Sequence, residues 1–417
     1  PMEPALVLKK LQISWQKAVL HFLPLGGFSS HNHVEIYHEG DVAFIRIFHA
    51  ISQARFSIYL ETYILAGDRL GLLLREELIK AHKRGVSVTI IYDHFGSAGL
   101  ASGFLRPMAD LGITILAFNP IWPWRRRGPL LFRDHRKIIV IDEKLAFCGS
   151  MNMSADYAGP IYGSNRFRDT TARVEGPAVK DLLAITKESI AEALLEKDKV
   201  DLKDLSSAPD DKHWVFTEVF LRLIGKEPQE TLDPNPGTLV QVLRSNMYRH
   251  LAHIQKSMEE AVNRAVTYCF FTTPYFLPHD GLRKAIIHAK LRGVDMRVLT
   301  AGMSDVPLMR YASRHVYRGF LKQGIRIYEM TGKTLHAKIA TIDGVFSSVG
   351  SYNLDHWSAR RNLEVNLAII DQEIALKLKD QFERDLELSN EINHDEFFRR
   401  SIFRRFLCWV AYLIMRI

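Results

Sequence analysis

The side chains best suited to chemistry occur as two copies of one polar pattern. Each copy has a His, a Lys two residues later, and then an Asp, a Gly-Ser pair and an Asn at matched spacings. The copies are offset by 201 residues and comprise His135/His336, Lys137/Lys338, Asp142/Asp343, Ser150/Ser351 and Asn152/Asn353. An imidazole can attack phosphorus or carry a proton, an ammonium can neutralise a phosphate, and Ser and Asn can donate hydrogen bonds. Each copy therefore predicts half of a phosphodiester site.

The residues between these side chains predict the strand that positions them. The run from Lys137 to Ile141 is apolar and β-branched, which is typical of a buried strand. Residues two apart share one face of a strand, so His135 and Lys137 project together. Asp142 has the opposite parity and ends the strand. It therefore favours a structural role over a part in the reacting pair, although it belongs to the motif.

A second short strand over residues 145–148 is expected to return Ser150 and Asn152 toward the first. Gly149, just before Ser150, would let backbone N–H groups approach a phosphate closely, while the Ser and Asn side chains add neutral donors. Tyr63 and Tyr275, in the stretches ETYIL and TPYFL, fall at equivalent places near the predicted site. They either line the site or are buried strand aromatics.

The duplication extends to the fold. Residues 33–175 and 240–371 share one succession of strand and helix patterns, which predicts parallel strands covered by helices. We therefore expect an α/β protein of two similar domains. The predicted division is an amphipathic N-terminal segment at 1–30, domains at 31–198 and 238–395, a linker or surface excursion at 199–237, and an amphipathic C-terminal helix at 396–417.

The duplicated pattern resembles the H-x-K-x4-D…G-S-x-N signature of the phospholipase D superfamily, the HKD motif. The resemblance implies two mainly parallel or mixed sheets flanked by helices, related by a pseudo-twofold axis with the active site between them. It also implies a double displacement, in which one His forms a phosphohistidine and the other protonates the departing alcohol. We prefer His135 as nucleophile and His336 as acid, and the near symmetry of the motifs leaves the reverse order open.

Charge neutralisation in such a site falls to the two motif lysines. The sequence lacks the acidic cluster that two-metal phosphodiesterases need, so we expect no metal and no organic cofactor. In the superfamily, an acidic residue downstream of each motif holds the second nitrogen of the imidazole, and Asp169 and Glu364 occupy those places here. We prefer pairing across the halves, with Glu364 on His135 and Asp169 on His336.

Composition points to an anionic partner. The formal net charge is +8, which suits either nucleic acid or an anionic membrane surface. The three cysteines are far apart and lie in apolar surroundings, so they predict buried thiols in a reducing compartment. No apolar run reaches the roughly 18 residues needed to span a bilayer. We therefore expect a soluble or peripheral protein, of an oligomeric state that the sequence leaves open.

Three segments have the composition of a membrane surface. Residues 5–23 predict an amphipathic helix, for which packing on the core is the alternative. Another segment mixes rings and cations, which suit a lipid headgroup layer or, alternatively, the rim of a site or a nucleic-acid contact. Its residues are Trp122, Trp124, Arg125, Arg126 and Arg127. The third is the C-terminal helix, where core packing or oligomerisation is the alternative to the membrane contact predicted for Arg404, Arg405, Phe406 and Trp409.

Within the superfamily, stretches along both halves resemble bacterial cardiolipin synthases. Among them are DHRKIIVIDEKLAFCGSMN and LHAKIATIDGVFSSVGSYN. The resemblance implies transfer of a phosphatidyl group between two phosphatidylglycerol molecules, at the cytoplasmic face of the bacterial inner membrane. Many such synthases begin with two membrane-spanning helices that this chain lacks, so a short peripheral form is expected. The alternatives are a lipid hydrolase, a transferase using another headgroup, and a nuclease of the same superfamily.

Overall fold

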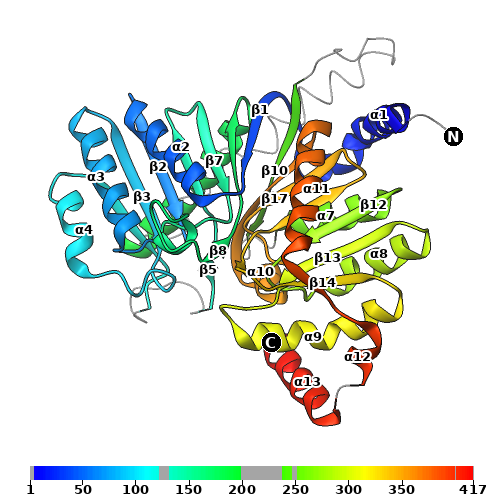
Figure 1. Cartoon of the computed structure of the whole chain (residues 1–417). Coiled ribbons are helices and arrows are strands. Elements are labelled where there is room, and N and C mark those ends of the chain that lie inside the picture. The colour runs from blue at the N-terminus through cyan, green and yellow to red at the C-terminus, as the bar shows by residue number, and fades with distance from the viewer. Residues whose placement is uncertain (1–3, 122–130, 199–236, 247–250, 400, 417) are drawn as a thin grey trace.

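The computed structural model describes residues 4–121, 131–198, 237–246, 251–399 and 401–416. It shows two α/β halves side by side, with strands β1 and β10 adjacent at the centre (Figure 1). Each half is a mixed sheet flanked by helices, so the predicted fold class is confirmed. The aromatic and basic segment containing Trp122 and Arg125, and nearly all of the predicted linker, lie outside the described residues.

The sheet of the first half is parallel on one side and antiparallel on the other. The three strands at its outer edge run parallel, and each later neighbour is antiparallel to the one before it. The order is β4 (Thr114–Phe118), β3 (Ser87–Asp93), β2 (Ser57–Thr62), β6 (Ile138–Ile141), β7 (Leu145–Gly149), β9 (Thr171–Glu175) and β1 (Ser29–Tyr37).

The second half repeats this order and the same strand directions. Its strands are β14 (Arg326–Met330), β13 (Asp295–Ala301), β12 (Tyr268–Thr272), β16 (Ile339–Ile342), β17 (Phe346–Gly350), β18 (Asn362–Ile370) and β10 (Thr238–Asn246), with β19 (Ser389–Glu391) added beside β14. The N-terminal part of β1 pairs with β10, so the two sheets meet along these strands.

Successive side chains of the central strands point to opposite faces and pack into two different hydrophobic cores. In β6, Ile139 and Ile141 join the core of the first half, while Ile138 and Val140 join a third core that also contains Leu367 of the second half. This explains why the strand is apolar on both faces. The third core is closed by α5 (Ala178–Asp198) and α11 (Gln372–Glu387), and it holds the halves together.

The outer faces of the two sheets carry the remaining large helices. The first half has α2 (Gly40–Gln53), α3 (Arg69–Lys83) and α4 (Ser102–Ala109), and the second has α7 (His253–Arg264), α8 (Asp280–Leu291) and α9 (Pro307–Lys322). The predicted N-terminal helix is α1 (Pro4–Phe22), and it packs on the second half. Trp15 is 2% exposed, stacks on Phe346 and donates from Nε1 to Asp343 at 3.2 Å. Of the two interpretations of this helix, the structure supports core packing.

Candidate active site

His135 is placed by a strand pairing between the halves. The two-residue strand β5 (Arg133–Asp134) runs parallel to the start of β18, and the His135 N–H donates to the Leu363 carbonyl at 3.0 Å. The imidazole therefore lies beside Glu364, the next residue of β18. Nδ1 of His135 is 3.0 Å from one carboxylate oxygen and 3.1 Å from the other.

His336 is placed by the matching arrangement in the opposite direction. Strand β15 (Thr334–Leu335) runs parallel to β8 (Phe167–Arg168), and the His336 N–H donates to the Arg168 carbonyl at 2.9 Å. Nδ1 of His336 is 2.7 Å from Oδ2 of Asp169. Each histidine thus takes its carboxylate from the other half, as predicted. A carboxylate on Nδ1 holds a neutral imidazole in the tautomer whose Nε2 can attack or accept a proton.

The motif serines hold the carboxylates. Ser351 donates to Glu364 at 2.5 Å, and Ser358 donates to its other oxygen at 2.7 Å. Ser150 donates to Asp169, which also accepts the Thr170 N–H at 2.7 Å. We expected these hydroxyls to serve as phosphate donors as well as supports, and the structure shows the supporting role.

The motif glycines serve close strand packing. A Cβ atom on Gly149 would lie 2.6 Å from the Thr170 carbonyl oxygen, and one on Gly350 would lie 2.2 Å from that of Val365. Any side chain there would push β7 or β17 away from its neighbour. The Gly149 N–H already donates to the Lys137 carbonyl, at 3.3 Å. The expected backbone approach to phosphate at these glycines is therefore replaced by an approach to the neighbouring strand.

The motif asparagines lie near the site with different contacts. Asn152 accepts the Ile64 N–H at 3.1 Å, which fixes the residue after Tyr63. Asn353 is buried, and its Oδ1 has no hydrogen-bond partner in the part of the chain that the structure describes. The amide of Asn353 could therefore rotate to point its N–H groups at a phosphate without breaking a hydrogen bond at Oδ1. Asn353 stays a candidate phosphate donor.

The motif aspartates lie at the far ends of their strands from the histidines. Asp142 accepts the backbone N–H groups of Arg55, Phe56 and Ser57 at 2.7–3.2 Å. Asp343 accepts those of residues 266–268 and the indole of Trp15. Each carboxylate therefore anchors the loop that enters the adjacent strand. This agrees with the structural role inferred from strand parity, and neither aspartate contacts a catalytic histidine.

The motif lysines are buried beside the histidines. Lys137 donates to the His135 carbonyl at 2.6 Å, while Lys338 donates to the His336 carbonyl and lies 3.1 Å from Nε2 of His336. Burial lowers the pKa of Lys137 to about 7. The carboxylate of Glu364 acts to raise this pKa, and the neighbouring ammonium of Lys338 acts to lower it further. Burial likewise lowers the pKa of Lys338 to about 8. A phosphate bound between the two ammoniums would favour their charged forms.

The histidines are also held neutral by their surroundings. Burial, together with the ammonium of Lys137, outweighs Glu364 and lowers the pKa of His135 to about 4. Burial and Lys338 lower the pKa of His336 in the same direction, against Asp169. At neutral pH both imidazoles are therefore unprotonated at Nε2 before substrate binds. One of them is then ready to act as a nucleophile.

These values predict how the rate depends on pH. We expect kcat/KM to fall below about pH 4, as His135 becomes protonated, to decline above the lowered pKa of His336, and to fall more steeply above about pH 7, as Lys137 loses its proton. In Lys137→Arg the cation persists, so the steeper part of the alkaline fall should begin at about pH 8, where Lys338 titrates. A pH profile measured on both proteins checks this. A steepening that begins at the same pH in both would contradict the assignment to Lys137.

Aromatic rings wall both histidines. The Tyr63 ring lies 5.0 Å from that of His135, with Nζ of Lys137 5.2 Å from its centroid, so of the two alternatives for Tyr63 the structure supports lining of the site. Tyr157 and Phe167 pack on His336 at 5.1 and 5.4 Å between ring centroids. The sequence analysis did not identify either ring, because neither belongs to the repeated pattern.

Tyr275 is not the equivalent of Tyr63, contrary to the sequence interpretation. Isolated bridges join Leu65 to Met153 and Phe276 to Leu354, which aligns Leu65 with Phe276. Tyr275 therefore corresponds to Ile64, one residue later than Tyr63. The strand pairings of Ile58 with Ile141 and of Cys269 with Ile342 give the same alignment, so the two tyrosines were matched by residue type alone. The phenol of Tyr275 instead donates to Asp305 at 2.5 Å.

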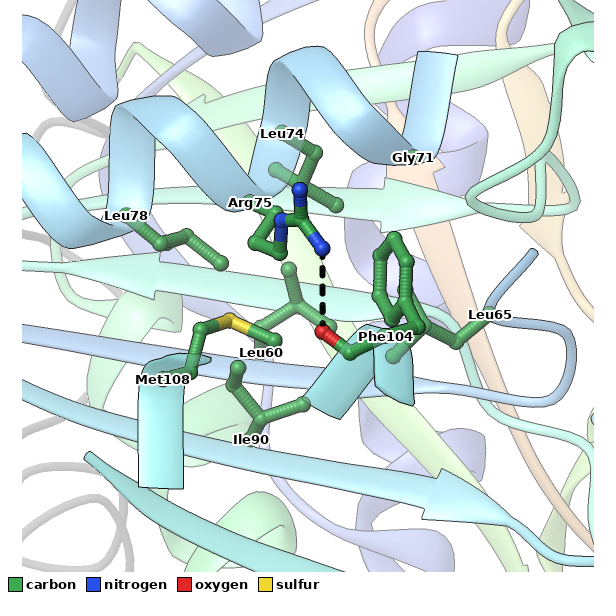
Figure 2. A pocket seen from close by; sticks show the side chains of 9 residues that line it. All are labelled: Leu60, Leu65, Gly71, Leu74, Arg75, Leu78, Ile90, Phe104 and Met108. Atoms are coloured by element: carbon green, nitrogen blue, oxygen red, sulfur yellow. Dashed lines mark hydrogen bonds between the residues drawn. The ribbon is translucent and has the colours of Figure 1, made fainter. Parts of the chain in front are cut away.

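An apolar hollow in the first half lies apart from these groups. Figure 2 shows it beneath α3, lined by Leu60, Leu74, Ile90, Phe104 and Met108 among others, with the Arg75 guanidinium donating to the Phe104 carbonyl at 3.3 Å. The space between these side chains is too narrow to hold a water molecule. None of its lining residues belongs to the site described above, and it offers no nucleophile. We regard it as a packing space of the first core.

Comparison with known proteins agrees with this geometry. A model of the family described as "Cardiolipin synthase, PLD-like domain" matches residues 47–170 and 258–386. Cardiolipin synthase 2 of Bacillus cereus is 31% identical over 375 residues, which cover 88% of this chain and 67% of that protein. Cardiolipin synthase B of Salmonella typhi is 30% identical over 358 residues, which cover 86% and 81%. The crystal structure of phosphatidylserine synthase from Haemophilus influenzae shares the fold, with a TM-score of 0.71 at 12% identity over 97% of this chain and 100% of that one.

Two His–Lys sets that exchange carboxylates across a pseudo-twofold arrangement define an enzyme of the phospholipase D superfamily. Within it, the chain belongs to the cardiolipin synthase family, a family of phosphatidyltransferases. The predictions of superfamily and enzyme class are thereby confirmed, and that of cardiolipin synthesis is confirmed at the level of the family.

Proposed function

We propose that this chain transfers a phosphatidyl group from one phosphatidylglycerol to a second, forming cardiolipin and releasing glycerol. The observation that carries the proposal is the pair of buried histidines, each oriented by a carboxylate from the other half. Two oriented imidazoles beside two ammoniums suit a covalent mechanism at a phosphodiester. The names of the relatives supply the lipid class.

In the first step, Nε2 of His135 attacks phosphorus and the bond to the glycerol oxygen breaks. The departing alkoxide takes a proton from Nε2 of His336, and Lys137 and Lys338 stabilise the charge on the phosphoryl oxygens. His336 must be protonated for this step. Binding of the anionic phosphodiester beside it favours that form, against the burial that lowers its pKa.

In the second step, the neutral His336 removes the proton from a hydroxyl of the next phosphatidylglycerol. That oxygen attacks phosphorus, the phosphorus–nitrogen bond breaks, and His135 is regenerated. Both histidines end in their starting states, so the cycle balances. Water could resolve the same intermediate, so transfer depends on a lipid hydroxyl occupying the site first.

The test is to incubate the purified protein with phosphatidylglycerol vesicles in the presence of EDTA and to analyse lipids and glycerol by mass spectrometry. Cardiolipin and glycerol in equal amounts, undiminished by the chelator, are expected. Phosphatidic acid as the sole lipid product would mean a hydrolase. No turnover of phosphatidylglycerol would overturn the proposal and direct attention to other phospholipids and to nucleic acid.

We further propose that the C-terminal helix binds an anionic membrane surface. Helix α13 (Ile402–Arg416) packs on α9 through Ala411 and Met415, and Figure 1 shows the two helices side by side. Its other face is exposed and apolar, with Phe403 68%, Phe406 53% and Trp409 43% exposed. The arginines Arg404 and Arg405 are exposed beside these rings. None of the helices that the structure describes is long and apolar enough to cross a bilayer.

This surface predicts a charge-dependent affinity. Each basic residue near an anionic bilayer contributes on the order of 1 kcal/mol, so Arg404→Gln with Arg405→Gln should weaken vesicle binding about 10- to 30-fold. Flotation with phosphatidylglycerol vesicles measures it. The matched control, Arg69→Gln with Arg106→Gln, removes two exposed cations from the other half and should bind as the parent protein does. Equal loss in both double variants would argue against a surface centred on α13.

A further inference from the structure

A carboxylate lies close to the second motif, because its partner Tyr275 precedes Phe276, which bridges Leu354, the residue after Asn353. Asp305 lies in the loop between β13 and α9 and is exposed, whereas Tyr275, which donates to its Oδ1 at 2.5 Å, is only 7% exposed. One oxygen is thus held by a buried phenol, and the carboxylate still faces solvent. Burial lowers the pKa of both His336 and Lys338, and the charge of Asp305 acts in the opposite direction on each.

Both partners are held in place by the fold. The Gly302 N–H donates to the Met330 carbonyl at 2.9 Å, and Ser304 bonds to both backbone groups of Val306, which fixes the loop on either side of Asp305. The Tyr275 carbonyl accepts from Thr273 at 2.9 Å. The Tyr275 ring packs in one cluster with residues of α9 and α13. The carboxylate is therefore positioned before any substrate arrives.

A carboxylate at this place repels an anionic phosphodiester. We therefore expect the substrate to offer another group that a carboxylate would attract. A fixed carboxylate is a strong acceptor of hydrogen bonds from hydroxyl groups. The two hydroxyls of a glycerol headgroup are such donors, and they are within a few bonds of the phosphate that the lysines bind. The first half lacks this group: four residues past the matching strand stands Ser97, whose hydroxyl bonds to the backbone of Tyr63 and Leu65.

We propose that Asp305, oriented by Tyr275, binds the hydroxyls of the glycerol headgroup of the donor lipid. The inference rests on the proposed function and adds a subsite to it. Because the subsite lies on the His336 side, it places the leaving glycerol next to the histidine that protonates it. The same contacts select a polyol headgroup over one without hydroxyls.

The test is a competition between two donors in the same vesicles, phosphatidylglycerol and phosphatidylethanol, with released glycerol and ethanol measured together. Asp305→Asn keeps an acceptor for the Tyr275 phenol but loses the charge. Losing a charged hydrogen bond to one headgroup should lower the glycerol-to-ethanol ratio about tenfold relative to the parent protein. Tyr275→Phe should lower it in the same direction by less, and Asp110→Asn, which removes an exposed carboxylate of the other half, should leave it unchanged.

An unchanged ratio in Asp305→Asn, or equal losses of both alcohols, would overturn the subsite. Failure of the proposed function would look different, because the parent protein itself would then form no cardiolipin. If the parent hydrolysed both lipids instead, the alcohol ratio would still report on headgroup recognition. The two claims therefore fail separately.

Discussion

His135→Ala and His336→Ala are each expected to reduce cardiolipin formation by at least about 10³-fold. The losses should differ in kind. His135→Ala removes the nucleophile, so no covalent intermediate can form. His336→Ala removes the proton donor, which matters most for a poor leaving group such as glycerol. If the headgroup of the donor lipid is p-nitrophenol, it leaves as the phenolate without needing a proton. Such a donor therefore separates the two roles.

With that donor, His336→Ala should release one equivalent of p-nitrophenolate in a burst, whereas His135→Ala should release none. Stopped-flow absorbance measures the burst. The exposed His49→Ala, far along the chain on α2, serves as the matched control and should behave as the parent protein. A burst in His135→Ala and none in His336→Ala would reverse the two assignments.

Glu364→Gln is expected to lower the rate of phosphatidyl transfer by about 10² to 10⁴-fold, because an amide cannot hold His135 in the required tautomer. Glu364 also accepts from Ser351 and Ser358, so the side chain should stay in place while its charge is lost. The effect should fall on formation of the covalent intermediate, because Glu364 orients His135, the nucleophile of that step.

Asp169→Asn should instead impair the steps that use His336. With the p-nitrophenyl donor, it should keep a burst that Glu364→Gln loses. The exposed Glu373→Gln on α11 is the matched control for charge removal. Equal bursts in the two carboxylate variants would argue against carboxylates exchanged between halves as separate supports for the two histidines.

The sequence predicted the elements that carry the motifs because their physics is local. The apolar run before Asp142 and the recurring Gly-Ser pair specify β6, β7, β16 and β17 by residue type and parity. The carboxylates Asp169 and Glu364 were identified through resemblance. Their exchange between halves depends on β5 pairing with β18 and β15 with β8. These two-residue pairings have no sequence signature. The sequence therefore allowed a preference for pairing across the halves but could not establish it.

Other features depend on contacts that spacing does not encode. The hydroxyl of Ser150 has several possible acceptors in sequence, and only the fold shows that it serves Asp169. Tyr275 was aligned with Tyr63 by residue type, whereas the strand pairings align it with Ile64. Tyr157 and Asp305 lie outside the two motifs; only in the folded chain does the Tyr157 ring pack on His336 and the charge of Asp305 act on it.

The most direct test of the account is to locate the covalent intermediate. Protein incubated with phosphatidylglycerol is quenched, digested and analysed by mass spectrometry under conditions that preserve phosphorus–nitrogen bonds. We predict a phosphatidyl adduct on His135, more abundant in Asp169→Asn and absent in His135→Ala. Cardiolipin formed at the normal rate with the adduct on His336, or with no adduct on either histidine, would contradict the proposed mechanism.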